Sequence, residues 1–80
     1  MQIKILAFGI AKEIVGGGAA VIALPEAPTV EKLRGVLVEQ YPALEQLASL
    51  AIAVNGTYAT DDQRLQPNDE VVLIPPVSGG

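Results

Sequence analysis

The chain has 80 residues, of which 50% are hydrophobic and 18% are charged, and its formal net charge is −4. It has no cysteine and no histidine, which excludes disulfides, thiolate chemistry and imidazole general bases. Its five basic residues are scattered along the sequence, which argues against a nucleic-acid partner.

The first part of the chain predicts two strands joined by a long loop. Residues 2–8 alternate between two faces, Ile3, Ile5 and Ala7 on one and Lys4, Leu6 and Phe8 on the other. Residues 9–20 include three glycines in a row and are predicted as a flexible loop. The β-branched run at 21–24 then predicts a second strand that pairs with the first as a hairpin.

An amphipathic helix is predicted next. Thr29 is a suitable N-cap, and Glu31 places a negative charge in the first turn, where it suits the helix dipole. Apolar residues recur at helical spacing and define one buried stripe: Val30, Leu33, Val36, Leu37 and Tyr41. Pro42 ends the helix, and a second short helical turn is expected at 43–50.

The rest of the chain predicts strands separated by tight turns. A short strand runs to Val54, and the following Asn55-Gly56 pair favours a type I′ hairpin turn. Leu65 is an isolated apolar residue in a polar stretch and is predicted to pack beneath its loop. Pro67, Asn68 and Asp69 predict a turn before the last strand, in which Val71 and Leu73 face one side and Val72 and Ile74 the other.

This order of elements, β-β-α-β-β, predicts an α+β fold with a mixed sheet of four to five strands and one main helix on one face. That is the β-grasp architecture of ubiquitin. The first and last strands are the most apolar, so we expect them to lie side by side in the centre of the sheet. Residues 1–80 would form one domain with an extended tail at 75–80. No membrane span or leader pattern is evident, and we expect a cytoplasmic protein.

Side-chain chemistry is sparse. The glycines at 16–18 lack the lysine of a phosphate-binding loop, and the paired acids at 61–62 and 69–70 lack calcium-loop spacing, so we interpret them as solvated turn residues. Ser49 and Ser78 have no histidine to activate them. The remaining candidate is the carboxylate of Gly80, which becomes an acyl donor once it is adenylated.

The terminal "IPPVSGG" suits that use, although a frayed terminus is the simpler interpretation of such an end. Pro75 and Pro76 favour an extended geometry, while Gly79 and Gly80 have no side chain to obstruct a narrow tunnel. Six extended residues reach at most roughly 20 Å. Strand positions away from the helix predict an exposed apolar patch for a partner, formed by Phe8, Tyr58 and Ile74.

Four segments together resemble the small subunit of molybdopterin synthase, the MoaD-type sulfur carriers of the ubiquitin-like superfamily. They are "IKILAFG", "TVEKLR", "AVNGTY" and "DEVVLIPPVSGG", and the last is the most specific. Two departures are Asn68, where glycine is frequent, and the triple glycine at 16–18.

The resemblance implies a non-catalytic, sulfur-donating subunit of an enzyme complex. An E1-like, MoeB-type enzyme would use ATP to adenylate Gly80, and a sulfur donor would convert it to a thiocarboxylate. The tail would then enter a MoaE-type large subunit, in a heterotetramer, and give sulfur to cyclic pyranopterin monophosphate.

The resemblance also implies which residues act. Gly80 and Gly79 would form the reactive end, and the large subunit would contact Phe8, Tyr58, Ile74, Pro75, Pro76, Val77 and Ser78. The chain itself would bind no metal or cofactor, and neither a membrane nor nucleic acid. The alternatives are a ThiS-like carrier for thiazole synthesis, a carrier for tRNA thiolation, and a ubiquitin-like modifier or binding module.

Overall fold

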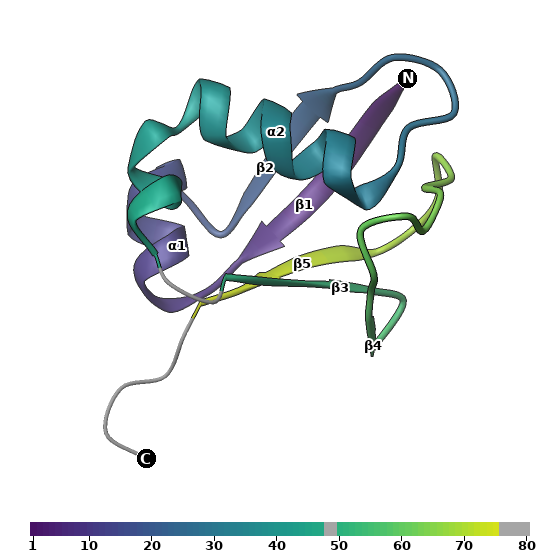
Figure 1. The fold of residues 1–80 in the computed structure, drawn as a ribbon. Helices are drawn as coiled ribbons and strands as arrows, with labels where there is room; N and C mark the ends of the chain where they lie inside the picture. The colour runs from purple at the N-terminus through teal and green to yellow at the C-terminus, as the bar shows by residue number, and fades with distance from the viewer. Residues whose placement is uncertain (48–49, 76–80) are drawn as a thin grey trace.

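The computed structural model describes residues 1–47 and 50–75. Within these residues, five strands form one sheet, with two α-helices and one 3₁₀ helix beside it (Figure 1). In chain order the elements are β1 (Gln2–Ala7), α1 (Gly9–Val15), β2 (Ala19–Ala23), α2 (Val30–Gln40), η1 (Pro42–Gln46), β3 (Ala51–Val54), β4 (Thr57–Tyr58) and β5 (Val71–Ile74).

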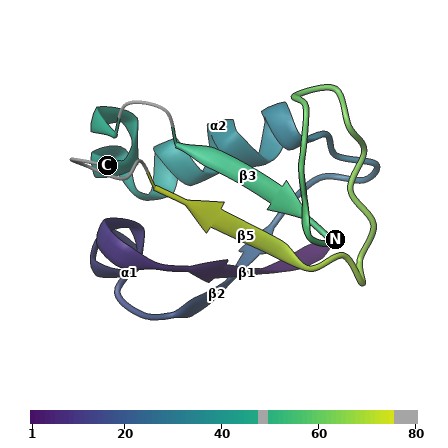
Figure 2. The same cartoon turned by 90° about the horizontal axis from the view of Figure 1, so that it is seen from below.

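The sheet is mixed, and its strands lie in the order β2-β1-β5-β3-β4. β1 and β5 are parallel, with Ile5 opposite Val71 and Ala7 opposite Leu73, whereas the other neighbours are antiparallel. The predicted placement of the first and last strands, central and adjacent, is therefore confirmed. Figure 2 shows β5 between β1 and β3, with α2 lying across one face of the sheet.

The prediction of a loop at residues 9–20 is wrong at both ends, because α1 occupies Gly9–Val15 and β2 begins at Ala19. Its Ala11 is fully buried, and Ile14 and Val15 pack against the core. Gly16 ends this helix with a left-handed φ of 90°, and the N–H groups of Gly16 and Gly17 both donate to the Lys12 carbonyl at 3.0 Å. The first glycine of the run is thus a helix cap.

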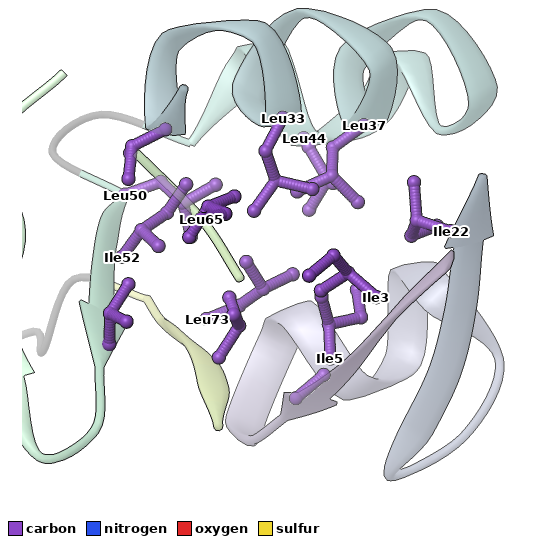
Figure 3. Close-up of a cluster of buried hydrophobic side chains, with 14 of the residues drawn as sticks. Ile3, Ile5, Ile22, Leu33, Leu37, Leu44, Leu50, Ile52, Leu65 and Leu73 are labelled. Carbon is purple, nitrogen blue, oxygen red and sulfur yellow. The ribbon is translucent and has the colours of Figure 1, made fainter. Parts of the chain in front are cut away.

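The core lies between α2 and the sheet, and the helices and the strands both contribute side chains to it (Figure 3). Thr29 caps α2 as predicted, because its Oγ1 accepts a hydrogen bond from the Lys32 N–H at 3.2 Å. The helix ends at Gln40, and Pro42 begins η1, the expected second helical turn. The largest fully buried side chains are Ile3, Ile5, Ile22, Leu33, Leu37, Leu44, Ile52, Leu65, Leu73, Val30 and Val71.

Two predicted loop features are confirmed in the segments that flank β4 and precede β5. Asn55 and Gly56 have φ angles of 53° and 84°, as a type I′ turn requires, and Leu65 is 2% exposed beneath its loop. The Asn55 side chain also reaches the turn before β5, donating to the Asp69 carboxylate at 2.9 Å and accepting from the Glu70 N–H at 2.9 Å.

Among the described residues, no helix is long and apolar enough to cross a membrane.

Candidate functional site

The predicted reactive end, Gly79 and Gly80, lies outside the described residues, as do Pro76, Val77 and Ser78. The structure does describe the point from which this tail departs. β5 ends at Ile74, which is paired with Ala51 of β3, and Pro75 follows it half-buried. The tail is therefore attached to a strand in the middle of the sheet.

The face of the sheet opposite α2, called the open face below, is largely apolar. Strand register assigns its residues, because side chains of directly opposed residues lie on the same face. The polar residues of this face are Gln2 and Lys4, and its apolar residues are Leu6, Phe8, Ala19, Val21, Ala23, Ala51, Ala53, Tyr58, Val72 and Ile74. Phe8, Val21 and Tyr58 are 57%, 62% and 69% exposed, so large apolar side chains on this face remain in contact with solvent.

Of the three residues in the predicted apolar patch, Phe8 and Ile74 are neighbours and Tyr58 is not. Phe8 continues β1 in an extended conformation (φ −130°, ψ 161°), which places it beside Ile74 when the β1–β5 register is extended by one position. Tyr58 lies on β4 in the row of Ala53 and Val72. It is two strands away from β5, a lateral separation of about 10 Å. The three side chains thus share one face without forming one contact cluster.

The open face changes character along its length. Phe8, Ile74 and Pro75 stand at the carboxyl ends of the parallel strands β1 and β5. At the other end, Lys4 and Glu70 precede the first paired residues, Ile5 and Val71, and both are exposed. The apolar end of the face is therefore the end from which the tail departs.

In addition to the tail residues 75–78, the sequence predicts partner contacts on the sheet itself at Phe8, Tyr58 and Ile74. Leu6 and Val72 lie between them on the same face, and Val21 extends the surface to the opposite edge strand. The alternation of the strands already separated Leu6 and Val72 from the buried set. Val21 needed the β1–β2 register, which places it opposite Lys4.

The acidic residues do not form a metal site in the described part of the chain, where no group of three or more His, Cys, Asp or Glu residues could hold an ion. Asp69 accepts hydrogen bonds from Asn55 and from the Gln66 N–H, and Asp62 accepts one from Thr60 at 2.6 Å. These carboxylates stabilise turns.

The family model described as the ThiS family matches residues 5–80 of the chain. Among curated proteins, the chain is 42% identical to the molybdopterin synthase sulfur carrier subunit of Escherichia coli, covering 99% of this chain and 100% of that protein. It is 37% identical to the Arabidopsis thaliana protein of the same name, covering 100% of this chain and 84% of that protein. The similarity therefore extends over the full length of the chain.

Two solved structures show the same fold. SAMP1 from Haloferax volcanii matches with a TM-score of 0.85 and 26% identity, covering 100% of both chains. A chain in the complex of subunits 1 and 2 of the molybdopterin-converting factor from Helicobacter pylori matches with a TM-score of 0.68 and 28% identity, again covering 100% of both. The predicted β-grasp architecture is confirmed by these ubiquitin-like neighbours.

Proposed function

Because this chain belongs to the ThiS family and, within it, to the molybdopterin synthase sulfur carrier subunits, we propose that its C-terminal carboxylate carries sulfur as a thiocarboxylate. The observation that supports this most strongly is that the family match continues to residue 80, beyond a strand that is paired on both sides. Such a strand gives the tail a firm attachment.

In the proposed chemistry, the carboxylate of Gly80 is charged with sulfur in two steps. First, a carboxylate oxygen attacks the α-phosphorus of ATP, pyrophosphate leaves, and an acyl adenylate forms. A sulfide-equivalent nucleophile from a sulfur donor then attacks the carbonyl carbon, AMP leaves, and a thiocarboxylate remains. The thiocarboxylate sulfur then displaces an oxygen substituent from a carbon of the acceptor, which gives a thioester. Water attacks the carbonyl carbon of this thioester, the C–S bond to Gly80 breaks, and the carboxylate is restored while the sulfur stays on the acceptor.

The acceptor in this proposal is cyclic pyranopterin monophosphate, bound by a MoaE-type large subunit, and two transfers would build its dithiolene. The likeness to a subunit within a molybdopterin-converting complex supports such a partner. The apolar end of the open face, with Phe8 57% exposed, offers the kind of surface that a partner buries. Contacts by Phe8, Tyr58, Ile74 and the tail residues 75–78, in a heterotetramer, belong to this proposal.

Activation is proposed to need an E1-like, MoeB-type enzyme, which uses ATP, and a separate sulfur donor. The chain lacks cysteine and histidine, so it has no thiol or imidazole of its own with which to activate the carboxylate. The lack of these two residue types is the reason to propose that other proteins supply the catalytic groups.

Intact mass spectrometry tests the proposal. The chain is incubated with the E1-like enzyme, ATP and a sulfur donor, and a variant with one added alanine after Gly80 serves as the control. We expect one oxygen-to-sulfur exchange, located at Gly80 by fragmentation, and none in the control. An unexchanged chain, together with a tail-deleted chain that still supports cofactor synthesis in cells, would refute the proposal.

A second candidate function is that of a ubiquitin-like modifier, favoured by the likeness to SAMP1, the small archaeal modifier protein 1 of Haloferax volcanii. A modifier would form an amide between Gly80 and a target lysine. Conjugates that contain the Gly80–lysine linkage, found by digestion and mass spectrometry of cell extracts, would support it. ThiS-like thiazole synthesis and tRNA thiolation use the same tail chemistry and differ in the partner that copurifies.

A further inference from the structure

Gly9 lies next to Pro75, the residue at which the tail begins. It is the first residue of α1, and it directly follows Phe8. A Cβ atom built on Gly9 would lie 3.3 Å from Cγ of Pro75, inside the ordinary carbon–carbon contact distance of about 3.5–4.0 Å. The start of α1 and the end of β5 lie at the same end of the sheet in Figures 1 and 2.

Position 9 therefore favours glycine for two separate reasons, its backbone conformation and the space beside it. The backbone of Gly9 has a φ of +56°, which residues with a Cβ adopt at a cost. In addition, the space where a side chain would begin is next to the ring of Pro75. That ring has little freedom to retreat, because proline fixes its own φ and the preceding Ile74 is paired with Ala51.

We propose that Gly9 is a positioning residue, which sets the direction in which the tail leaves the sheet by giving the Pro75 ring a flat backbone surface to rest on. This contact is called the proline seat below. The inference rests on the proposed function of the tail, since the direction matters only if a partner must receive Gly80. Gly80 is five residues beyond Pro75 in the chain.

The same helix supplies a matched control. Gly16, the C-cap of α1, also has a positive φ, of 90°, but a Cβ there would meet nothing within 4 Å. Asparagine tolerates positive φ better than other residues with a Cβ. Gly9→Asn therefore adds the obstructing atom with little backbone strain, and Gly16→Asn makes the same change in open space.

The experiment measures the rate of thiocarboxylate formation in a single turnover by intact mass spectrometry. The concentration of the activating enzyme is varied, so that the maximal rate and the enzyme concentration that gives half of it are obtained separately. Misplacement of a reacting group by about 1 Å can cost up to a hundredfold in rate, so we expect Gly9→Asn to lower the maximal rate about tenfold or more. Half-saturation should change little, because the open face is unaltered. Gly16→Asn should stay within about twofold of the unsubstituted chain in both. Equal rates for the two variants would overturn the proposal.

A double-mutant cycle with Pro75→Ala tests the contact independently of the chemistry. Removal of the ring should abolish the difference between Gly9→Asn and its parent, both in the maximal rate and in the urea unfolding midpoint. Strict additivity in unfolding would overturn the proline seat. If the unsubstituted chain is never charged with sulfur, the proposed function fails, and the unfolding cycle still decides whether the seat exists.

Discussion

The two faces of the sheet are built from alternate residues of the same strands, but they differ in what covers them. In β5, Val71 and Leu73 are fully buried beneath α2, whereas Val72 and Ile74 on the open face are only half-buried. In β1, Ile5 is fully buried and the following open-face position, Leu6, is half-buried. Burial thus changes at every step along one strand.

This difference separates stability from binding within one short segment. Apolar area hidden under α2 is already removed from water and contributes to folding. Apolar area at Phe8 and Tyr58, which are 57% and 69% exposed, contributes only when a partner covers it. Substitutions one residue apart should therefore change different measured quantities.

The largest effect is expected from Leu73→Ala. This side chain is fully buried, and truncation of a buried leucine costs about 2–5 kcal/mol of unfolding free energy. Val72→Ala truncates the half-buried neighbour on the open face and should cost about 1 kcal/mol or less. Urea denaturation followed by circular dichroism measures both, and equal losses would remove the distinction between the faces.

The next largest effect is expected at Phe8, in binding. Phe8→Ala should weaken binding of the large subunit by about 2 kcal/mol, or roughly thirtyfold, as for an interface hot spot. The unfolding free energy should change by about 0.5 kcal/mol. Isothermal titration calorimetry measures the affinity.

Val21→Ala is the control for that prediction, because Val21 is 62% exposed on the same face but lies on β2, away from the tail. Its substitution should leave the affinity unchanged. If Val21→Ala weakens binding as much as Phe8→Ala does, the partner covers the whole open face and not its tail end alone.

A smaller effect is expected at Asn55, which links the β3–β4 turn to the turn before β5. Asn55→Gly keeps the positive φ and loses both side-chain hydrogen bonds, at a cost of about 1–2 kcal/mol. Asn55→Ala adds backbone strain and should cost about 1 kcal/mol more. Thermal unfolding compares the two, and an alanine variant as stable as the glycine variant would contradict the strain argument.

The smallest effect is expected at Gly35, on the exposed side of α2, where a Cβ would meet nothing within 4 Å. Gly35→Ala should stabilise the fold by about 0.5–1 kcal/mol, because alanine is the better helix former. The substitution alters neither face of the sheet, so the affinity for the large subunit should be unchanged. A raised melting temperature with altered affinity would contradict this prediction.

The features predicted correctly from the sequence are those that depend on residues close together in the chain. Alternation assigned the two faces of β1 and β5, Thr29 marked the start of α2, and Asn55-Gly56 gave the hairpin turn. Each of these depends on residues a few positions apart, so short-range rules suffice.

The features that were missed depend on contacts between distant residues. α1 has only seven residues, and its buried Ala11 with the flanking Ile14 makes a pattern too short to outweigh the glycines that follow. Packing against the sheet stabilises this helix, as is usual for short helices. The proximity of Gly9 to Pro75 brings together residues from opposite ends of the chain. Rules based on neighbouring residues in the sequence cannot predict it.

The double pairing of β5 also has a mechanical consequence. A partner that draws the tail into a pocket pulls along the axis of β5, whose hydrogen bonds run across that axis to β1 on one side and β3 on the other. Traction therefore loads both ladders in shear, and their bonds must break together. An edge strand under the same pull would have one ladder to resist it, so the central strand can stay folded through repeated threading and withdrawal.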